Sequence, residues 1–387
     1  MLMAAIVTAK NIFVVVGEAS GDAHAGRLLA ELKQTAPNIN VKGIGGDSMR
    51  AAGAEIIIDF SELAVMGLVE VLKRYRSLKK IFNKVVALLK QERPDLLVLV
   101  DYPGFNLKLA KEAKKLGIPV LYYISPKVWA WKAGRVKTIK RVVNHMAVLF
   151  PFEVPIYEQA SVPVTCVGHP LVDAVKVELS KQEIKTKMGM ALNRRIVGLF
   201  PGSRRSEVEA LLPVMLKAAE KLQQSDDAID FVMPLASGLD SSVTENMLAA
   251  SKLNVRVVSG DFYELTTACD AVVAASGTVT LEIALLGVPH FLVYRVSPIT
   301  YTILKRLVHI PYVGLCNIIT GKNTVLELLQ HDVTDDRLAT ELKGLLNAAD
   351  SQQKATHIQQ QVLSALGPSG GAHNAAKLVA DIINKSE

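Results

Sequence analysis

The chain has 387 residues, too many for one ordinary hydrophobic core, and this length predicts two domains. Half of the residues are apolar and no low-complexity tract occurs, which excludes a disordered protein. The net charge of +7, from 44 basic and 37 acidic residues, favours an anionic partner without identifying it.

The targeting and metal-binding signals are weak. No apolar run reaches the roughly 18 residues of a membrane-spanning helix. Lys10 follows the first apolar stretch instead of preceding it, so segment 12–16 is better explained as a strand than as a signal peptide. The three cysteines lie far apart, and no Asp-x-Asp or His-x-His pair follows a predicted strand. We therefore expect a cytoplasmic location, no metal site and no cofactor.

The first predicted strand, 11–16, ends at a polar turn that contains two glycines. The turn reads Gly17-Glu18-Ala19-Ser20-Gly21-Asp22, and a helix is predicted from 23 to 33. Glycine lets the backbone approach a ligand, and open parallel sheets bind ligands at the carboxyl ends of their strands. An ordinary strand-to-helix turn explains the same residues, and the spacing differs from the dinucleotide-binding fingerprint.

Apolar and basic residues crowd together between Glu62 and Phe82. The candidate surface residues are Val65, Met66, Leu68, Val69, Leu72, Lys73, Arg74 and Arg76. An apolar patch beside cations is typical of a protein that binds an anionic membrane surface. The alternative is a pair of helices in the core with a solvated basic end.

An aspartate ends the next buried strand. Strand 95–100 leads into Asp101-Tyr102-Pro103-Gly104-Phe105-Asn106. A carboxylate at the end of a parallel strand can accept a proton from a hydroxyl nucleophile, although a turn or capping role also explains Asp101. His24 and His169 also lie near predicted ligand-binding edges, and either could act as a base.

Both tryptophans follow the predicted strand 119–124, in Ser125-Pro126-Lys127-Val128-Trp129-Ala130-Trp131-Lys132. Six cations and no acid lie between 127 and 141. Such a loop could wrap an anionic or acylated ligand, or bind nucleic acid by stacking and charge, whereas a solvated basic helix beneath buried aromatics is the alternative. Strands predicted at 146–150 and 164–167 complete an alternating pattern typical of a doubly wound domain.

A polar helical segment separates this domain from a second series of strands. We expect a first domain at 1–172, a linker at 173–193, a second domain at 194–365, and a final helical segment, 366–387, that packs back on a first domain. The strands predicted in the second domain are 196–200, 231–234, 255–258, 271–274 and 290–293.

Two turns of the second domain are candidate phosphate sites. Strand 196–200 leads into Pro201-Gly202-Ser203-Arg204 and a helix, whose unpaired first N–H groups and dipole favour an anion. Arg204 adds a fork of donors suited to phosphate. In the second turn, Ser276, Gly277 and Thr278 could hold phosphate and Glu282 could accept both ribose hydroxyls, although a helix cap also explains the hydroxyl residues.

Five motifs occur in the order found in one family. They are Gly17-Glu18-Ala19-Ser20-Gly21-Asp22, Ser61-Glu62-Leu63-Ala64-Val65-Met66-Gly67, Asp101 to Asn106, Ser125 to Trp131, and Pro201 to Arg204. Together they resemble the lipid-A-disaccharide synthase family of nucleotide-sugar glycosyltransferases, over nearly the whole chain. The resemblance implies an α/β protein of the GT-B fold, with two Rossmann-like doubly wound domains facing across a cleft.

The resemblance also implies a reaction and roles for residues. The reaction is the inverting transfer of 2,3-diacylglucosamine from UDP to 2,3-diacylglucosamine 1-phosphate, which gives a β-1,6-linked disaccharide 1-phosphate and UDP. Asp101, or else His24, would take the proton of the acceptor hydroxyl, and Arg204 would stabilise the leaving diphosphate. The UDP-binding residues would be Gly202, Ser203, Arg204, Ser276, Gly277, Thr278, Glu282 and Asn317. The acceptor-binding residues would be Glu18, Ser20, Gly21 and Asp22.

Because both substrates carry acyl chains, the resemblance favours peripheral binding to lipids on the cytoplasmic face of the inner membrane. A homodimer is compatible with it, and nucleic acid is not an expected partner. The chain departs from the family pattern at Gly104, where a second acid is usual, and at Cys316, where proline is common. A UDP-sugar 2-epimerase and a nucleotide- or nucleic-acid-binding protein are the competing interpretations.

Overall fold

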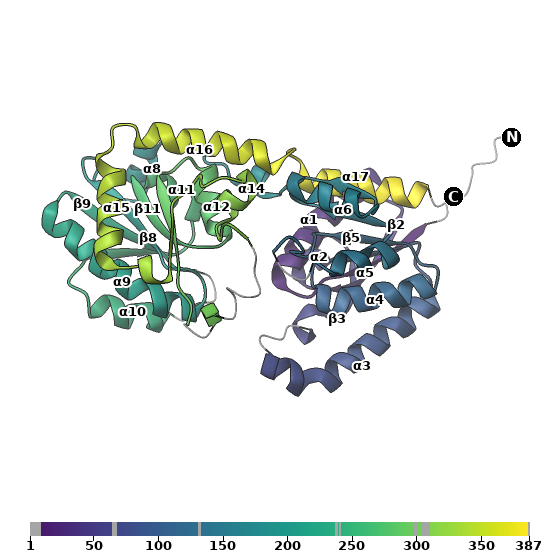
Figure 1. The fold of residues 1–387 in the computed structure, drawn as a ribbon. Coiled ribbons are helices and arrows are strands. Elements are labelled where there is room, and N and C mark those ends of the chain that lie inside the picture. The colour runs from purple at the N-terminus through teal and green to yellow at the C-terminus, as the bar shows by residue number, and fades with distance from the viewer. Residues whose placement is uncertain are drawn as a thin grey trace. The chain divides into compact units, whose positions relative to one another are not determined.

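Two parallel sheets organise the computed structural model, which describes residues 9–63, 68–130, 133–236, 239, 241–297, 300–302 and 310–385 (Figure 1). Each sheet belongs to its own compact unit. Unit 1 contains Met1–Pro170 and Gly367–Glu387, and unit 2 contains Leu171–Leu366. The final segment of the chain therefore belongs to the same unit as the first.

The sheet of unit 1 has seven parallel strands in the order β3-β2-β1-β4-β5-β6-β7. The strands are β1 (Lys10–Val15), β2 (Ile39–Gly45), β3 (Glu55–Asp59), β4 (Leu96–Val100), β5 (Val120–Tyr123), β6 (His145–Val148) and β7 (Val164–Cys166). The helices of this unit are α1 (Ala19–Thr35), α2 (Asp47–Ala51), α3 (Leu68–Glu92), α4 (Pro103–Lys115), α5 (Arg135–Val142), α6 (Val154–Gln159) and α17 (Gly371–Asn384).

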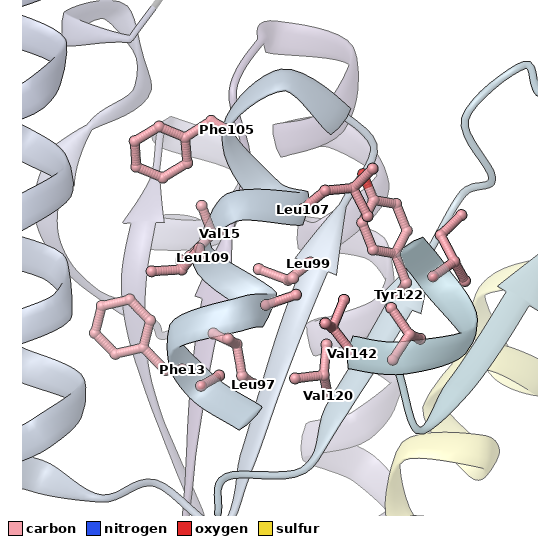
Figure 2. Close-up of a cluster of buried hydrophobic side chains, with 14 of the residues drawn as sticks. Phe13, Val15, Leu97, Leu99, Phe105, Leu107, Leu109, Val120, Tyr122 and Val142 are labelled. Carbon is pink, nitrogen blue, oxygen red and sulfur yellow. The ribbon is translucent and has the colours of Figure 1, made fainter. Parts of the chain in front are cut away.

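Both faces of this sheet are buried, which explains why its strands read as continuous apolar runs. Phe13 and Leu97 point to the face where α4 supplies Phe105 and Leu109, as Figure 2 shows. The neighbouring Val14 points to the opposite face, where residues of α1 and α17 cover it. α17 contacts α1 closely, and its packing residues there are Ala375, Ala376, Val379 and Ile383.

The sheet of unit 2 has six parallel strands in the order β10-β9-β8-β11-β12-β13. The strands are β8 (Arg195–Phe200), β9 (Ile229–Pro234), β10 (Val255–Val258), β11 (Ala271–Ala275), β12 (His290–Tyr294) and β13 (Glu327–Leu329). The helices are α7 (Leu171–Ala174), α8 (Lys181–Lys187), α9 (Arg205–Ser225), α10 (Ser241–Ala249), α11 (Phe262–Ala268), α12 (Thr278–Leu285), α14 (Leu315–Thr320), α15 (Asp335–Asn347) and α16 (Ser351–Leu366).

Two features of unit 2 differ from the expectations drawn from the sequence. Strand β13 was not predicted, because three residues are too few to show a period. The segment 173–193, expected to be a linker, contains α8, whose Ile184 is fully buried beside Ile196. Lys181 of the same helix forms an ion pair with Asp270 at 2.7 Å. This segment is therefore part of the packed structure of unit 2.

No helix within the described part of the chain is long and apolar enough to cross a membrane.

A buried carboxylate joins the first two helices of unit 1. Asp22 of α1 accepts hydrogen bonds from the backbone N–H groups of Gly46 at 2.6 Å, Ser48 at 2.9 Å and Met49 at 3.4 Å. These groups lie at the start of α2, where a helix leaves its N–H groups without partners. Asp22 therefore caps α2 from another helix.

We expect Asp22→Asn to destabilise unit 1 by about 1–3 kcal/mol, because the amide places an N–H₂ group against backbone donors. Urea denaturation followed by circular dichroism measures this loss. Asp47→Asn is the matched control, since Asp47 is fully exposed on the same short helix and pairs with Arg50 on the surface. It should leave the denaturation midpoint nearly unchanged. An equal loss in both variants would contradict the capping role of Asp22.

Candidate functional site

The order of the strands reverses once in each sheet. In unit 1 the chain runs from β1 outward to β2 and β3, and then returns to β4 on the other side of β1. In unit 2 the same reversal occurs between β8 and β11. Open parallel sheets bind ligands at the carboxyl ends of the strands that flank such a reversal. Glu18 and Asp101 follow β1 and β4, while Arg204 and Ser276 follow β8 and β11, so each reversal collects predicted site residues.

Asp101 lies in a turn that is fixed by hydrogen bonds. Asp101 and Tyr102 have φ angles of 44° and 45°, in the left-handed region that side chains disfavour. The carbonyl oxygen of Asp101 accepts hydrogen bonds from Asn106 Nδ2 at 2.9 Å and from the Tyr122 hydroxyl at 2.5 Å. Its N–H donates to the carbonyl of Tyr123 at 3.0 Å. The buried Asn106 and Tyr122 therefore hold the direction of the Asp101 side chain.

The surroundings of Asp101 suit a proton acceptor. Burial, together with the negative charge of Glu18, raises the pKa of Asp101 to about 6, although Lys127, the Tyr102 backbone and Arg135 partly oppose this rise. A carboxylate with this pKa is ionised at neutral pH and is more basic than a fully solvated one. Neither Asn106 nor Tyr122 was predicted as a site residue, although Asn106 belongs to the same motif.

The glycine-containing turn after β1 packs against the Asp101 turn. A Cβ atom added to Gly17 would lie 2.2 Å from Cγ of Tyr102, so only glycine fits under this ring. The Tyr102 hydroxyl donates to the carbonyl oxygen of Leu63 at 2.9 Å. Glu18 and Ser20 are exposed at the end of the turn, and the Ser20 hydroxyl donates to the Glu18 carboxylate. Gly21 is buried against Val16 and Val100.

Two residues predicted near this edge have other surroundings. Asp22, predicted to bind the acceptor, uses its carboxylate to cap α2, as described above. Burial, together with the Arg27 charge, lowers the pKa of His24 to about 4. Its ring packs edge-on to Tyr123, and its Nδ1 atom is buried without a hydrogen-bond partner among the described residues. His24 is therefore neutral at pH 7, and so is His169, whose pKa burial lowers to about 4.

The predicted diphosphate turn of unit 2 already holds a carboxylate. Gly202 has a φ angle of +111°, and Glu207 Oε2 accepts hydrogen bonds from the N–H groups of Ser203 and Arg204 at 3.2 Å. The guanidinium of Arg204 pairs with Glu207 Oε1 at 3.2 Å, with its side chain 78% exposed. A carboxylate thus occupies the anion-binding N-terminus of α9. An anion bound at this turn would compete with Glu207 for these donors.

The second predicted turn is more open. Gly277 is the N-cap residue of α12 and has no side chain with which to cap the helix, and a Cβ atom added to it would have no neighbour within 4 Å among the described residues. Thr278 is exposed at the first position of the helix. Burial raises the pKa of Glu282, one turn further on, while the Tyr263 hydroxyl donates to its Oε1 at 3.1 Å. Tyr263, which sequence analysis missed, orients this carboxylate.

The side chain of Asn317, predicted to bind UDP, makes hydrogen bonds within unit 2. Its side chain is fully buried, and Oδ1 accepts the N–H groups of Thr324 and Val325 at 2.8 Å. Nδ2 donates to the Val325 carbonyl and to Glu327 Oε1, each at 2.7 Å. An amide can make about four good hydrogen bonds. Asn317 therefore holds the loop that follows α14, and direct contact with a ligand would require it to give up these bonds.

The predicted membrane-binding residues lie mostly outside what the structure describes. Val65 and Met66 fall outside the described residues, and so do the side chains of Leu68, Val69, Leu72, Lys73 and Arg74 on α3. Arg76 is exposed. Further along α3, Ile81, Val85 and Leu89 are buried in the core.

No cluster of three or more histidine, cysteine, aspartate or glutamate side chains that could hold a metal ion occurs among the described residues.

Solved structures that match this chain over both α/β units include sugar-nucleotide enzymes. A UDP-GlcNAc 2-epimerase from Neisseria meningitidis, bound to UDP-GlcNAc, matches with a TM-score of 0.63 at 15% identity, over 97% of this chain and 100% of that one. The calicheamicin glycosyltransferase CalG4 matches with a TM-score of 0.63 at 16% identity, over 98% and 99% of the two chains. These similarities establish the GT-B fold and nothing finer.

Comparison of sequences identifies the family, whereas the structural similarities identify only the fold. The family model described as lipid-A-disaccharide synthetase matches residues 12–383. A lipid-A-disaccharide synthase of Trichlorobacter lovleyi is 46% identical over 381 residues, which cover 97% of this chain and 98% of that protein. One of Coxiella burnetii is 41% identical over 378 residues, which cover 97% and 99%. The chain therefore belongs to the lipid-A-disaccharide synthase family of glycosyltransferases.

Proposed function

We propose that the protein transfers 2,3-diacylglucosamine from UDP to the 6-hydroxyl of 2,3-diacylglucosamine 1-phosphate, with inversion, to form the lipid A disaccharide 1-phosphate and UDP. The observation that carries this proposal is the complementary chemistry of the two strand-order reversals. Unit 1 presents a carboxylate whose pKa is raised to about 6. Unit 2 presents an exposed arginine and the N-terminus of α12, where the N-cap residue is Gly277. Deprotonating an acceptor and stabilising a leaving diphosphate need these two kinds of group.

On the donor side, Arg204 leaves Glu207 and stabilises the charge that develops on the departing diphosphate. The N–H groups of Gly202 and Ser203 lie at the same turn. Ser276, Gly277 and Thr278 hold the remaining phosphate, and Glu282, oriented by Tyr263, accepts the ribose hydroxyls. Asn317 acts indirectly in this scheme by keeping the loop after α14 in place.

On the acceptor side, Asp101 takes the proton of the attacking hydroxyl. Its pKa of about 6 makes it a stronger base than His24, whose pKa burial and Arg27 lower to about 4. Glu18 and Ser20 line the acceptor site next to it, with Gly21 supporting the turn.

Because both proposed substrates are acylated, we place the enzyme on lipids at the cytoplasmic face of the inner membrane. The segment 65–76, with its apolar residues followed by cations, suits this contact. A homodimer is compatible with this arrangement.

The experiment that tests the proposed function supplies UDP-2,3-diacylglucosamine and the 1-phosphate acceptor to the purified protein, and measures the release of UDP. We expect release that depends on the acceptor. A 2-epimerase would instead convert the sugar without this dependence. Background release with intact UDP binding would overturn the assignment.

Asp101→Asn should reduce kcat by about 10²–10⁴-fold, because the amide cannot accept the proton, while the affinity for UDP stays unchanged. The wild-type rate should be full above the pKa of Asp101 and should fall as the pH decreases through about 6, since the base must be ionised. Steady-state kinetics between pH 5 and pH 8, together with UDP titration, provide these values. A near-normal rate for the variant would show that another group is the base.

Arg204→Ala should weaken UDP binding and turnover together by roughly 10–100-fold, the range expected for lost hydrogen bonds to a charged group. Calorimetric titration with UDP and the transfer assay test the two effects separately. Arg205→Ala is the matched control, because Arg205 is the next residue and pairs with Glu209 on the surface. If both variants bind UDP equally well, Arg204 lies outside the diphosphate site.

Replacing Val65, Met66, Leu68 and Leu72 together by serine should release the protein from anionic vesicles, because the substitution removes the apolar contact but keeps the neighbouring cations. Vesicle sedimentation at moderate salt measures this release, and circular dichroism checks the fold. Unfolding of the variant would instead show that these residues belong to the core.

A further inference from the structure

A glutamate at the edge of the second sheet meets the start of α14. Glu327 begins β13 and pairs in register with Leu292 of β12. Its neighbour Leu328 packs in the cluster formed by α9 and α15, so Glu327 points to the opposite face of the sheet. The start of α14 lies close to that face, because a Cβ atom added to Gly314 would be 2.2 Å from Cδ2 of Leu292.

The carboxylate of Glu327 accepts three hydrogen bonds from the segment Val313–Asn317. Its Oε2 atom accepts the backbone N–H of Val313 at 2.9 Å. Its Oε1 atom accepts the backbone N–H of Gly314 at 3.0 Å and Nδ2 of Asn317 at 2.7 Å. Hydrogen bonds to a charged acceptor are stronger than those between neutral groups. One side chain of β13 therefore holds the entry to α14.

The peptide group between Val313 and Gly314 connects Glu327 to the Ser276 turn. Its N–H donates to Glu327, and its carbonyl oxygen accepts the hydroxyl of Ser276 at 3.4 Å. Because a peptide group is planar, fixing the N–H also fixes the direction of the carbonyl. The backbone of Ser276 is held independently, since its N–H donates to the carbonyl of Val293 at 2.9 Å. The direction of the Ser276 hydroxyl thus depends on the position of Val313.

Further contacts fix the rest of this segment. The thiol of Cys316, which is fully buried, donates to the carbonyl oxygen of Thr280 on α12 at 3.4 Å. Asn317 binds Thr324 and Val325 of the loop after α14, as described above. Each of these contacts joins the segment to one neighbour, whereas Glu327 joins its first two N–H groups to Asn317. Loss of the Glu327 carboxylate would therefore release the segment mainly at its start.

We propose that Glu327 is a positioning residue for the donor side of the site, which holds the segment Val313–Asn317 against the hydroxyl of Ser276. The effect on UDP binding rests on the proposed function, whereas the link between Glu327 and the segment does not. Two measurements separate these claims.

The first measurement is hydrogen exchange of the backbone amides, without a ligand. In Glu327→Gln, the amides of Val313 and Gly314 should exchange about 10-fold faster, because the side-chain amide cannot accept all three hydrogen bonds. The amides of α9 should keep their protection. Asp332→Asn is the matched control, since it removes an exposed carboxylate five residues further on and should change neither rate. Unchanged exchange at Val313 and Gly314, or an equal loss throughout unit 2, would overturn the positioning role.

The second measurement is calorimetric titration with UDP. Glu327→Gln should weaken UDP binding by about 10-fold, because the ligand must then order the segment itself, and Asp332→Asn should bind UDP normally. In the transfer assay, KM for the UDP-sugar should rise, whereas KM for the acceptor should stay unchanged, since the proposed acceptor residues belong to unit 1. A general loss of stability would reduce the amount of active protein without changing either KM.

Glu327→Asp keeps the charge but withdraws the carboxylate by one methylene group. It should show both effects to a smaller degree, and it provides the test if Glu327→Gln does not fold. Equal UDP affinity in the wild type and in a folded Glu327 variant with faster exchange would overturn the effect on the donor side. Failure of the wild type to bind UDP would instead defeat the proposed function and leave the exchange result standing.

Discussion

Both sheets are parallel and buried on both faces, and this constraint decides where the protein can perform chemistry. Within β1 and β8 nearly every side chain is needed for packing, as the alternation of Val14 and Val15 between two apolar clusters shows. Polar groups are therefore displaced to the ends of the strands. Of these ends, only those beside a reversal of strand order leave room for a ligand between diverging connections. Each sheet has one such reversal, which is why residues as distant in sequence as Glu18 and Asp101 share one edge.

Contacts with neighbouring residues stabilise the strained backbone of the Asp101 turn. Two consecutive residues in the left-handed region cost about 1–3 kcal/mol each, so neighbouring contacts must compensate. Asn106 and Tyr122 do so through the Asp101 carbonyl, and the Tyr102 ring fits only because Gly17 has no side chain. Gly104 of this turn is exposed, and a Cβ atom there would meet nothing within 4 Å in the described structure. The absence of the second acid that the family resemblance implies at this position therefore costs no packing.

Sequence predicted the alternating fold because long apolar strands and glycine-containing turns are local signals. It predicted where Asp101 and Arg204 lie for the same reason. It did not show that the side chains of Asp22 and Asn317 bind backbone N–H groups: Asp22 accepts those at the start of α2, and Asn317 accepts those of the loop after its own helix. Such partners depend on which loops the fold brings together, and no spacing along the chain encodes them. Sequence likewise did not predict that Tyr263 orients Glu282, because the two residues lie on different helices.

The occupied N-terminus of α9 changes what this site can contribute to catalysis. Glu207 accepts the N–H groups of Ser203 and Arg204, so a diphosphate that binds there must displace a carboxylate. The binding free energy of the diphosphate is then the difference between its own interaction with these donors and the interaction of Glu207 with them. The interaction with Glu207 is lost to the same extent in the ground state and in the transition state. Charge that develops as the glycosidic bond breaks adds only to the transition state. In the proposed reaction, competition from Glu207 therefore weakens the binding of UDP-sugar and of UDP without reducing the stabilisation that accelerates transfer. In that reaction Glu207 would also give the donors a partner again when UDP leaves.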